Sequence, residues 1–241
     1  MRAKEFTQEA IKALSPYDFR GGKKYLRTAK WPANDRWIRR SRPLPGYGKD
    51  FRYIVDRREI SIVAQQKNGN FIEVAVLELA SAPVDLPFKT GVYQVGLITT
   101  HEAYRGMGLA KKLYELYFKH LGKVLIAGES QSASGRRNWI SMFNSDNIEV
   151  SGLLGMYDGM FSDARDYTKY LQRLQKYLDD LMAMGAEYVG AGGSGGGKTH
   201  WFRVPLRQDK NRLEVFLKTP RIKIYGRLGD LETTLMATWK K

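Results

Sequence analysis

The sequence predicts an α+β fold: a mixed, mainly antiparallel central sheet flanked by helices, with a helical insertion and extra C-terminal strands. Three observations predict this class. Short β-branched and aromatic runs separated by turn residues fill much of the first half, which is typical of a strand meander. An amphipathic helix pattern follows a glycine-rich loop, and a second long apolar stripe comes after residue 160. Further strand-like runs follow the glycine-rich segment 192–197.

The meander is predicted from turn residues and β-branched runs. The segment Lys67–Asn70 contains Asn-Gly, which favours a two-residue hairpin turn between strands. The expected elements are, in chain order, strands at Tyr53–Val55 and Glu59–Ala64, this turn, a strand at Phe71–Leu79, a loop with two prolines at Ala82–Lys89, and a strand at Val92–Thr99.

Helical periodicity predicts the next element. Apolar residues recur at helical spacing at Leu109, Leu113, Leu116 or Tyr117, and Leu121, so a helix is expected at Gly106–Leu121. The elements expected after it are a short buried strand at Lys123–Gly128 and a helix at Ser134–Phe143.

The second half predicts one long helix and then strands. Ser162 is a candidate N-cap, with Asp163 and Asp166 in the first turn. The apolar stripe of this helix consists of Tyr167, Leu171, Leu174, Leu178 and Leu181. Strands are expected at Trp201–Leu206, Arg212–Leu217, Ile222–Tyr225 and Thr233–Trp239.

Composition favours a polyanion partner and excludes thiol chemistry. The chain has 241 residues, no cysteine and a formal net charge of +15, and such charge attracts nucleic acid, an anionic membrane or a phosphate-rich ligand. Without cysteine there are no disulfides and no thiolate sites. The three histidines (His101, His120 and His200) are far apart in sequence, which gives little support for a metal site. A charged N-terminus and the lack of a bilayer-length apolar run predict a cytoplasmic protein with no membrane partner.

The N-terminal flank is basic and aromatic. A short amphipathic helix is expected at Thr7–Leu14 and irregular chain at Ser15–Tyr53. Arg20–Arg58 contains 13 Lys and Arg but 3 Asp. The interleaved aromatic residues are Tyr25, Trp31, Trp37, Tyr47 and Phe51. Two interpretations stay open: basic groups neutralise phosphates while rings stack on unpaired bases, or the flank is solvated and its aromatic residues plug the edge of the core.

The strongest functional pattern is a strand, a loop and a glycine-rich helix start. The first N–H groups of a helix have no internal partner, and the helix dipole makes that end positive. Gly106 and Gly108 carry no side chain, so a pyrophosphate can approach the backbone. Arg105 and Lys111 add positive charge there. The alternative is a tight turn that only requires glycine.

These residues also resemble a known superfamily. Arg105, Gly108 and Ala110 match Gln/Arg-x-x-Gly-x-Gly/Ala, the acetyl-CoA signature of the GCN5-related N-acetyltransferases (the GNAT superfamily), and Tyr104–Gly108 matches its YRGxG form. The resemblance covers roughly Tyr53–Phe143. It implies a single domain over residues 1–241, with a basic aromatic flank (1–52), an acyl-CoA-binding core (53–143) and a helical insertion with C-terminal strands (144–241).

The resemblance also implies a cofactor, acetyl-CoA or another acyl-CoA, and the residues that contact it. Backbone amides over Arg105–Ala110 are expected to hold the pyrophosphate. The strand end at Leu97–Thr99 is expected to run beside the pantetheine arm, and to splay from the strand at Val124–Gly128. The implied contacts are Leu97, Ile98, Thr99, Arg105, Gly106, Met107, Gly108, Leu109, Ala110 and Lys111. No metal is expected.

Catalysis in such enzymes is usually direct attack by the acceptor nitrogen on the thioester, which needs a base, an oxyanion donor and an acid for the thiolate. Glu129, which ends the second splayed strand, and His101, beside the cofactor loop, are the candidate bases. Many members carry a tyrosine on the following helix, but Gly135–Phe143 contains none. Ser132, Ser134 or Tyr157 are candidate substitutes; alternatively no acid is needed, or catalysis is lost.

The net charge points to a nucleic-acid acceptor, with DNA favoured. The long insertions resemble phage-encoded acyltransferases, and within that group the Mom proteins, which modify adenine in DNA, are the comparison of interest. The alternatives are an acetyltransferase for a protein or small-molecule amine, and a non-catalytic nucleic-acid-binding or virion-associated protein. The oligomeric state is left open.

Two further patterns are weaker. Gly192–Thr199 has the Walker A spelling, but a strand-like run follows it where a nucleotide-binding P-loop needs a helix. Arg136 and Arg137 precede Trp139. This group is expected either to contact a phosphate and a stacked base, or to combine solvated arginines with a tryptophan in the core, which is the favoured interpretation for Trp139.

Overall fold

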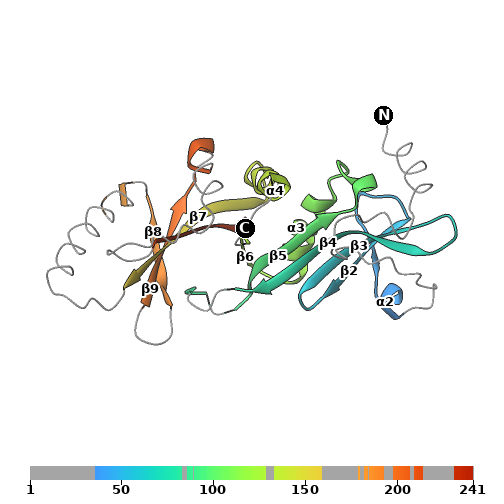
Figure 1. The fold of residues 1–241 in the computed structure, drawn as a ribbon, viewed down its shortest axis with the longest axis horizontal. Helices are drawn as coiled ribbons and strands as arrows, with labels where there is room; N and C mark the ends of the chain where they lie inside the picture. The colour runs from blue at the N-terminus through green and yellow to red at the C-terminus, as the bar shows by residue number, and fades with distance from the viewer. Residues whose placement is uncertain are drawn as a thin grey trace. The chain divides into compact units, whose positions relative to one another are not determined.

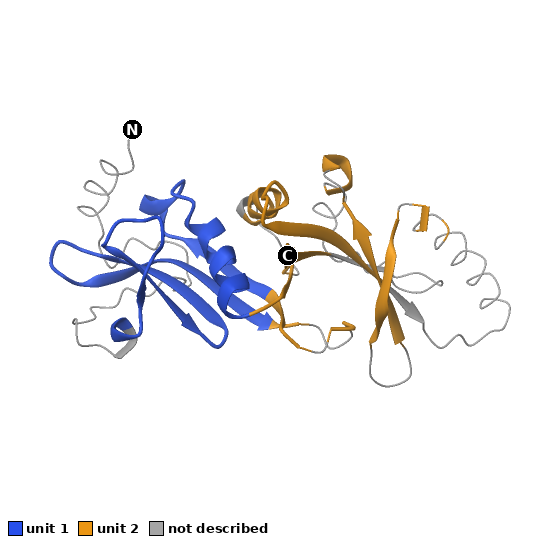
Figure 2. Cartoon of the chain, turned by 180° about the vertical axis from the view of Figure 1, so that it is seen from behind, with its two compact units in different colours: residues 1–80, 95–121 blue, residues 81–94, 122–241 orange. Residues whose placement is uncertain are grey.

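The structure is a computed structural model that describes residues 36–82, 86–88, 90–128, 133–158, 179, 182–183, 185–192, 198–206, 209–213 and 231–240. The chain divides into two compact units (Figure 2). Unit 1 consists of residues 1–80 and 95–121, and unit 2 of residues 81–94 and 122–241.

Within the described residues, ten strands are hydrogen-bonded in the order β1-β2-β3-β4-β5-β6-β10-β7-β9-β8 (Figure 1). The defined registers are antiparallel, except that β5 and β6 are parallel. The predicted α+β class with a mixed, mainly antiparallel sheet is therefore confirmed.

Unit 1 contains the strand meander. Its elements are α2 (Arg36–Arg39), β1 (Arg42–Pro43), β2 (Phe51–Asp56), β3 (Glu59–Gln65), β4 (Phe71–Ser81), β5 (Val92–Thr100), the 3₁₀ helix η1 (Glu102–Tyr104) and α3 (Leu109–His120), with the last residue of β4 and the first three of β5 in unit 2. The predicted strands and the hairpin turn between β3 and β4 are confirmed. In that turn Gly69 has a φ of 80°, and the Asn68 side chain accepts a hydrogen bond from the Asn70 N–H.

The core of unit 1 lies between α3 and the sheet. Leu109, Leu113, Leu116 and Tyr117 of α3 are buried, as their spacing predicts, and α3 packs on β3. Burying such side chains contributes about 1.5–3 kcal/mol each. A second cluster joins the short helix α2 to the sheet, and its members are Ile38, Ile54, Val63 and Phe71.

Two predictions in unit 1 are wrong in detail. The helix begins at Leu109 rather than at Gly106, because Gly106 and Gly108 have φ angles of 83° and 77° and so lie outside helical geometry. Part of the segment predicted to be irregular forms α2, whose Ile38 is buried.

Unit 2 is built around a strand that comes late in the chain. Its elements are β6 (Val124–Ile126), α4 (Ala133–Phe143), β7 (Ile148–Asp158), β8 (Glu187–Gly192), β9 (Lys198–Pro205) and β10 (Leu231–Trp239). β10 pairs with β6 through Met236–Thr238 on one side and with β7 along its whole length on the other. The predicted elements β6, α4, β9 and β10 are confirmed.

Trp201 lies at the centre of the core of unit 2. It is 1% exposed and belongs to a buried cluster with Leu86, Ile126, Leu153 and Met236. Gly155 lies on the strand paired with β9, directly opposite Trp201. A Cβ at Gly155 would lie 2.8 Å from two atoms of the indole, Cη2 and Cζ3, so glycine is required for this packing.

The prediction of a strand at Arg212–Leu217 is wrong at its start. Arg212 and Leu213 are helical. The Asp209 carboxylate caps this turn by accepting hydrogen bonds from the N–H groups of Asn211 (2.9 Å) and Arg212 (3.3 Å), which is the usual way an N-terminal helical turn is stabilised.

Several predicted elements lie outside the described residues. They are the helix at Thr7–Leu14, most of the helix after Ser162, the remainder of Arg212–Leu217 and the strand at Ile222–Tyr225. Of the long helix, Asp179, Met182 and Ala183 are described and are helical. No helix among the described residues is long and apolar enough to cross a membrane.

The end of α3 predicts a pH-dependent stability. The His120 ring lies 5.6 Å from the Tyr53 ring, with Nε2 3.2 Å from the tyrosine hydroxyl. Burial, with Lys119 and Arg42 nearby, lowers the pKa of His120. The unfolded chain therefore binds a proton at this histidine at higher pH than the native chain does, so stability is lost as the pH falls through the ordinary histidine pKa.

We expect this loss to be smaller in the variant His120→Gln. The measurement is urea unfolding of both proteins at about pH 7.5 and about pH 5.5, on either side of the ordinary histidine pKa. An equal loss of unfolding free energy in the two proteins would contradict the assignment.

Candidate phosphate-binding loop

The candidate site lies in unit 1, where β5 leads through η1 and a glycine loop into α3 (Figure 1). His101 begins the connection. Its N–H donates to the Val74 carbonyl of β4 at 2.8 Å, and its Nδ1 accepts from the Ala103 N–H at 3.2 Å. The histidine thus joins the end of the sheet to η1 and fixes where the loop starts.

The strand that enters the loop has a partly exposed end. In the described chain, β5 pairs with β6 over Val92–Gln94 only, and the β5 residues that follow are half-buried, or exposed at Gly96. Leu97, Ile98 and Thr99 are among the half-buried residues. This part of β5 therefore has the accessibility that an extended ligand needs to lie beside it.

Two left-handed glycines shape the loop. Gly106 (φ 83°) and Gly108 (φ 77°) are both exposed, and Gly108 is the N-cap of α3. A Cβ built at Gly106 meets nothing within 4 Å, so the space above the loop is open. The N–H groups of the first turn of α3 have no intrahelical partners. The loop therefore meets the two conditions for an anion: backbone donors and room to approach them.

Positive charge lies at this end of α3. Arg105 and Lys111 are exposed, while Leu109 is 1% exposed and anchors the start of the helix in the core. An Arg105 guanidinium nitrogen lies 4.0 Å from a Glu102 carboxylate oxygen, and both side chains are exposed. Ion pairs of this kind contribute little to stability. Lys112 is bonded to Glu115 at 2.8 Å. Arg105 and Lys111 are thus the cations best placed to approach an anion.

Tyr47 fixes the loop from the side, a role that the sequence does not reveal. Its hydroxyl donates to the Met107 carbonyl at 2.7 Å. A Cβ at Gly108 would lie 3.3 Å from the oxygen of this Tyr47 hydroxyl. Burial and the nearby Glu115 carboxylate raise the pKa of Tyr47, so the hydroxyl stays protonated and able to donate. The only sequence signal is the aromatic character of the flank, since 60 residues separate the two partners.

A cluster of aromatic rings connects Tyr47 to the 3₁₀ helix η1. The centroid of the Phe51 ring lies 5.6 Å from that of Tyr47 and 6.1 Å from that of Tyr104. The Tyr104 ring in turn lies edge-on to the His101 ring, with 5.8 Å between the centroids. Tyr104 is 1% exposed, and no described residue bonds to its hydroxyl. Burial raises the pKa of Tyr104 to about 12, so this hydroxyl is neutral under ordinary conditions.

The unpaired Tyr104 hydroxyl leads to a stability prediction. A buried polar group without a hydrogen bond costs about 1–3 kcal/mol, so Tyr104→Phe is expected to raise the unfolding free energy by about 1 kcal/mol while keeping the ring contacts. Urea unfolding measures the change, with Tyr53→Phe as a control, because the Tyr53 hydroxyl has the partner described above. A clear loss of stability in Tyr104→Phe would show that the hydroxyl is bonded in solution.

The structure brings one candidate catalytic residue to the loop. His101 is 9% exposed and its Nδ1 caps η1, so its observed contacts are structural. Glu129 and Ser132 lie outside the described residues. The backbones of Ser134 and Tyr157 belong to α4 and β7 of unit 2. The implied cofactor contacts, in contrast, are contiguous along the end of β5, the loop and the first turn of α3.

The structure places parts of the two weaker sequence patterns, the Walker A spelling and the arginines before Trp139. Lys198 and Thr199 of the Walker A spelling lie in strand β9, so no helix follows the glycines as a P-loop requires. Trp139 is 2% exposed and belongs to the core, as favoured, and Arg136 and Arg137 are exposed on α4.

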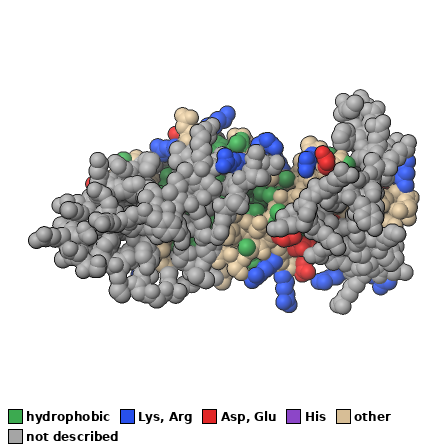
Figure 3. All heavy atoms as spheres, viewed as in Figure 1, with side chains coloured by type: hydrophobic (Ala, Val, Ile, Leu, Met, Phe, Trp, Pro, Cys, Tyr) green, Lys and Arg blue, Asp and Glu red, His purple; other side chains and the backbone are tan. Residues whose placement is uncertain are grey.

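The basic flank is described only from residue 36. Here Phe51 is buried, in agreement with an aromatic residue that plugs the core. Arg39, Arg40, Arg42 and Lys49 are exposed. Figure 3 shows Lys and Arg side chains at several separate places on the face it presents, without one continuous basic patch among the described residues. Polyanion binding by the flank stays a prediction.

No model of a protein family matches the chain, and no curated protein matches it at a significant level.

Proposed function

We propose that the chain is an acyl-CoA-dependent N-acyltransferase of the GNAT type that acts on a nucleic-acid acceptor, with DNA favoured, as in Mom-like base modification. The observation that carries the proposal is the loop between β5 and α3. Gly106 and Gly108 are exposed with positive φ, and open space lies above Gly106. The loop joins a partly exposed strand end to a helix start.

These features fit two parts of an acyl-CoA, the pyrophosphate and the pantetheine arm. The first-turn N–H groups of α3, with Arg105 and Lys111, would hold the pyrophosphate. The half-buried end of β5 at Leu97–Thr99 would lie beside the pantetheine arm.

The acyl-CoA would supply an activated thioester. The acceptor nitrogen would attack its carbonyl carbon and lose a proton to the base. The carbon–sulfur bond would break, and the CoA thiolate would leave and take up a proton from the acid. A backbone N–H at the end of β5 would stabilise the negative charge on the oxygen. The candidate bases are Glu129 and His101. The candidate acids are Ser132, Ser134 and Tyr157.

The nucleic-acid acceptor is supported by charge. The net charge of +15 is larger than one CoA requires, and exposed Arg39, Arg40, Arg42 and Lys49 lie in the described part of the flank. Basic groups of this kind bind phosphates with a strong salt dependence.

Thermal unfolding with acetyl-CoA tests the donor. A ligand at one hundred times its Kd stabilises the native state by about 2.7 kcal/mol, so a clear rise in Tm is expected. The Gly108→Val variant under the same conditions is the control, because its loop is expected not to hold the pyrophosphate. No rise in Tm at millimolar acetyl-CoA would refute the proposal.

Mass spectrometry tests the acceptor. DNA and protein from cells that express the chain are compared with the same fractions from cells that express the Gly108→Val variant. An added acyl mass on a DNA base is expected in the first sample only. An added mass on protein alone would assign a protein acceptor, and no added mass in any fraction would indicate a non-catalytic binding protein.

A further inference from the structure

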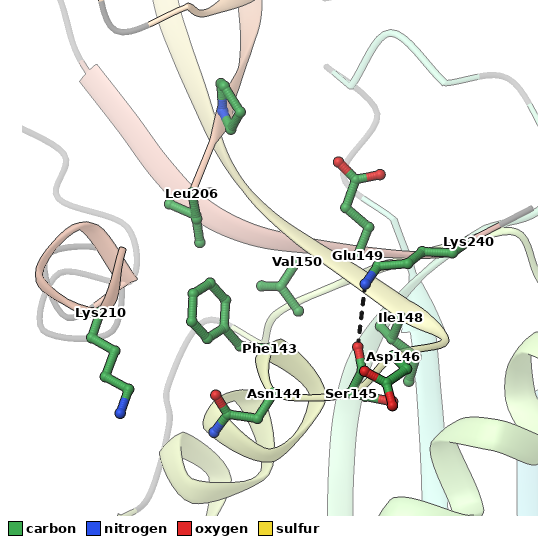
Figure 4. Close-up of a pocket in the computed structure, with 11 residues that line it drawn as sticks. Phe143, Asn144, Ser145, Asp146, Ile148, Glu149, Val150, Leu206, Lys210 and Lys240 are labelled. Atoms are coloured by element: carbon green, nitrogen blue, oxygen red, sulfur yellow. Dashed lines mark hydrogen bonds between the residues drawn. The ribbon is translucent and has the colours of Figure 1, made fainter. Parts of the chain in front are cut away.

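Unit 2 contains a hollow of its own. It has a volume of about 500 Å³ and lies where the end of α4, the start of β7, the end of β9 and Lys240 meet. Figure 4 shows the residues that line it. They are Phe143, Asn144, Ser145, Asp146, Ile148, Glu149, Val150, Pro205, Leu206, Lys210 and Lys240. The volume lies within the range of small-molecule sites, about 300–1,000 Å³.

The lining provides a half-buried aromatic ring in an apolar wall. The Phe143 side chain lies between Leu206 and Asn144 in Figure 4, with Val150 beside it. Leu206 is 1% exposed and Val150 6%, so both are anchored in the core, whereas Phe143 is only half-buried. An accessible aromatic ring is a stacking surface for a planar group.

Polar groups surround this ring. Asn144 is exposed directly after α4, and its amide offers donors and an acceptor to the edge of a base. Lys210 lies on one side of Phe143 and Lys240 on the other (Figure 4). The Lys240 ammonium donates to the Ser145 carbonyl at 3.4 Å, and Lys210 is exposed. The exposed Lys210 ammonium near a stacking ring fits a planar ligand that carries negative charge.

The carboxylates of the lining do not favour a cation. Glu149 is paired with Arg203, and its carboxylate points away from Asp146 in Figure 4. Of the two carboxylates in the lining, Glu149 is thus neutralised by Arg203, which leaves Asp146. No group of three or more His, Asp and Glu that suits a metal ion exists among the described residues. An anionic ligand is the better match.

We propose that this hollow binds a nucleoside monophosphate, with the base stacked on Phe143, its edge beside Asn144 and its phosphate held by Lys210. The same chemistry is offered by a free nucleotide and by an unpaired nucleotide of a DNA strand. The inference goes beyond the acyltransferase proposal, because it uses unit 2 alone and does not require acyl-CoA binding by unit 1.

Calorimetric titration of the full chain at low salt tests the proposal with four probes: AMP, adenosine, inorganic phosphate and a short single-stranded oligodeoxynucleotide. AMP is expected to bind more tightly than adenosine or phosphate alone. Tighter binding of the oligonucleotide than of AMP would assign the site to a DNA strand, and the reverse order to a free nucleotide. No heat from either of these two at millimolar concentration would overturn the proposal.

Variants localise the binding. Lys210→Gln is expected to weaken AMP about tenfold and leave adenosine unchanged, because it removes the charged contact to phosphate. Phe143→Leu keeps an apolar side chain but removes the stacking ring, so it is expected to weaken AMP and adenosine alike by about tenfold. Far-UV circular dichroism and Tm verify that each variant is folded.

Lys198→Gln is the matched control for charge. Lys198 is an exposed lysine at the opposite end of β9 from Pro205, roughly 23 Å away along an extended strand. Its replacement is expected to leave AMP binding unchanged. If Lys198→Gln weakens AMP as much as the pocket variants do, the binding is non-specific attraction to a basic protein and the proposed pocket is wrong. The Gly108→Val variant should still bind AMP, which separates this result from a failure of the acyl-CoA proposal.

Discussion

Replacing Gly108 by valine is expected to abolish acetyl-CoA binding, with an effect of at least one hundredfold on the Kd. Gly108 has a φ of 77°, and a Cβ there would lie 3.3 Å from the Tyr47 hydroxyl that bonds to Met107. A β-branched residue in the left-handed region costs about 1–2 kcal/mol or more. Relief of that strain requires the loop to change conformation or Tyr47 to move, and either change disrupts the N–H donors at the start of α3.

The measurement is a calorimetric titration with acetyl-CoA, supported by the rise in Tm. Gly69→Val is the matched control, because Gly69 has a φ of 80° in the turn between β3 and β4, and a Cβ there meets nothing within 4 Å. Both variants carry the same backbone strain and should lose similar stability. Only Gly108→Val should lose acetyl-CoA. Equal affinity in the two variants would show that the glycine loop does not hold the cofactor.

Replacing Trp201 by alanine is expected to lower the unfolding free energy by about 3–5 kcal/mol, the largest stability effect that we anticipate. The indole is 1% exposed and contacts a buried cluster from four separate segments of unit 2. Removing it leaves a cavity that the paired strands β7 and β9 cannot close without breaking their register. Urea unfolding followed by circular dichroism measures the loss.

Trp239→Ala is the control for this variant, because Trp239 is 44% exposed at the end of β10. Its loss is expected to cost about 1 kcal/mol or less. Similar losses in the two variants would mean that Trp201 is not the centre of this core.

A double-mutant cycle between Gly155 and Trp201 tests the same packing from the other side. Gly155→Ala places a methyl group 2.8 Å from the far ring of the indole and 2.9 Å from the Thr199 methyl, so overpacking of about 1–3 kcal/mol is expected. In a Trp201→Phe background that ring is absent, and the cost of Gly155→Ala should fall by at least about 1 kcal/mol. Simple additivity of the two changes would contradict a direct contact.

The sequence predicts the elements whose local signals and tertiary roles agree. β-branched runs and the Asn-Gly turn predict β2–β5, and the apolar face of α3 has the predicted burial at Leu109, Leu113, Leu116 and Tyr117. The order of strand, loop and helix at the candidate site is likewise confirmed. In these segments propensity and periodicity both favour the observed conformation.

Two of the strands that the sequence does not predict, β7 and β8, contain glycine for reasons of packing. β7 carries Gly152 and Gly155, and glycine usually weakens a strand. Gly155 is there because Trp201 lies against it, a contact made by a residue far along the chain. β8 contains Gly190, where the register with β9 shifts and a Cβ would lie 2.8 Å from Pro87. Such requirements depend on tertiary contacts and have no local signal.

At the candidate site, the backbone pattern is predictable and its support is not. Gly106, Gly108 and the helix start follow from the motif, whereas the hydrogen bond from Tyr47 joins segments 60 residues apart. The Asp209 cap has the opposite character: its signal is local, but the β-branched and aliphatic residues that follow it favour a strand prediction. Short caps are therefore easily outweighed in a sequence-based assignment.

The position of β10 has a consequence for the order in which the molecule forms during translation. β10 lies between β6 and β7 in the sheet, yet it is synthesised about a hundred residues after β6, which takes roughly 5–20 seconds at common elongation rates. Until then, β6 and the inner edge of β7 lack the strand that separates them. The segments of unit 1 are complete by Leu121, so the glycine loop can form on the ribosome while the sheet of unit 2 still has an open edge.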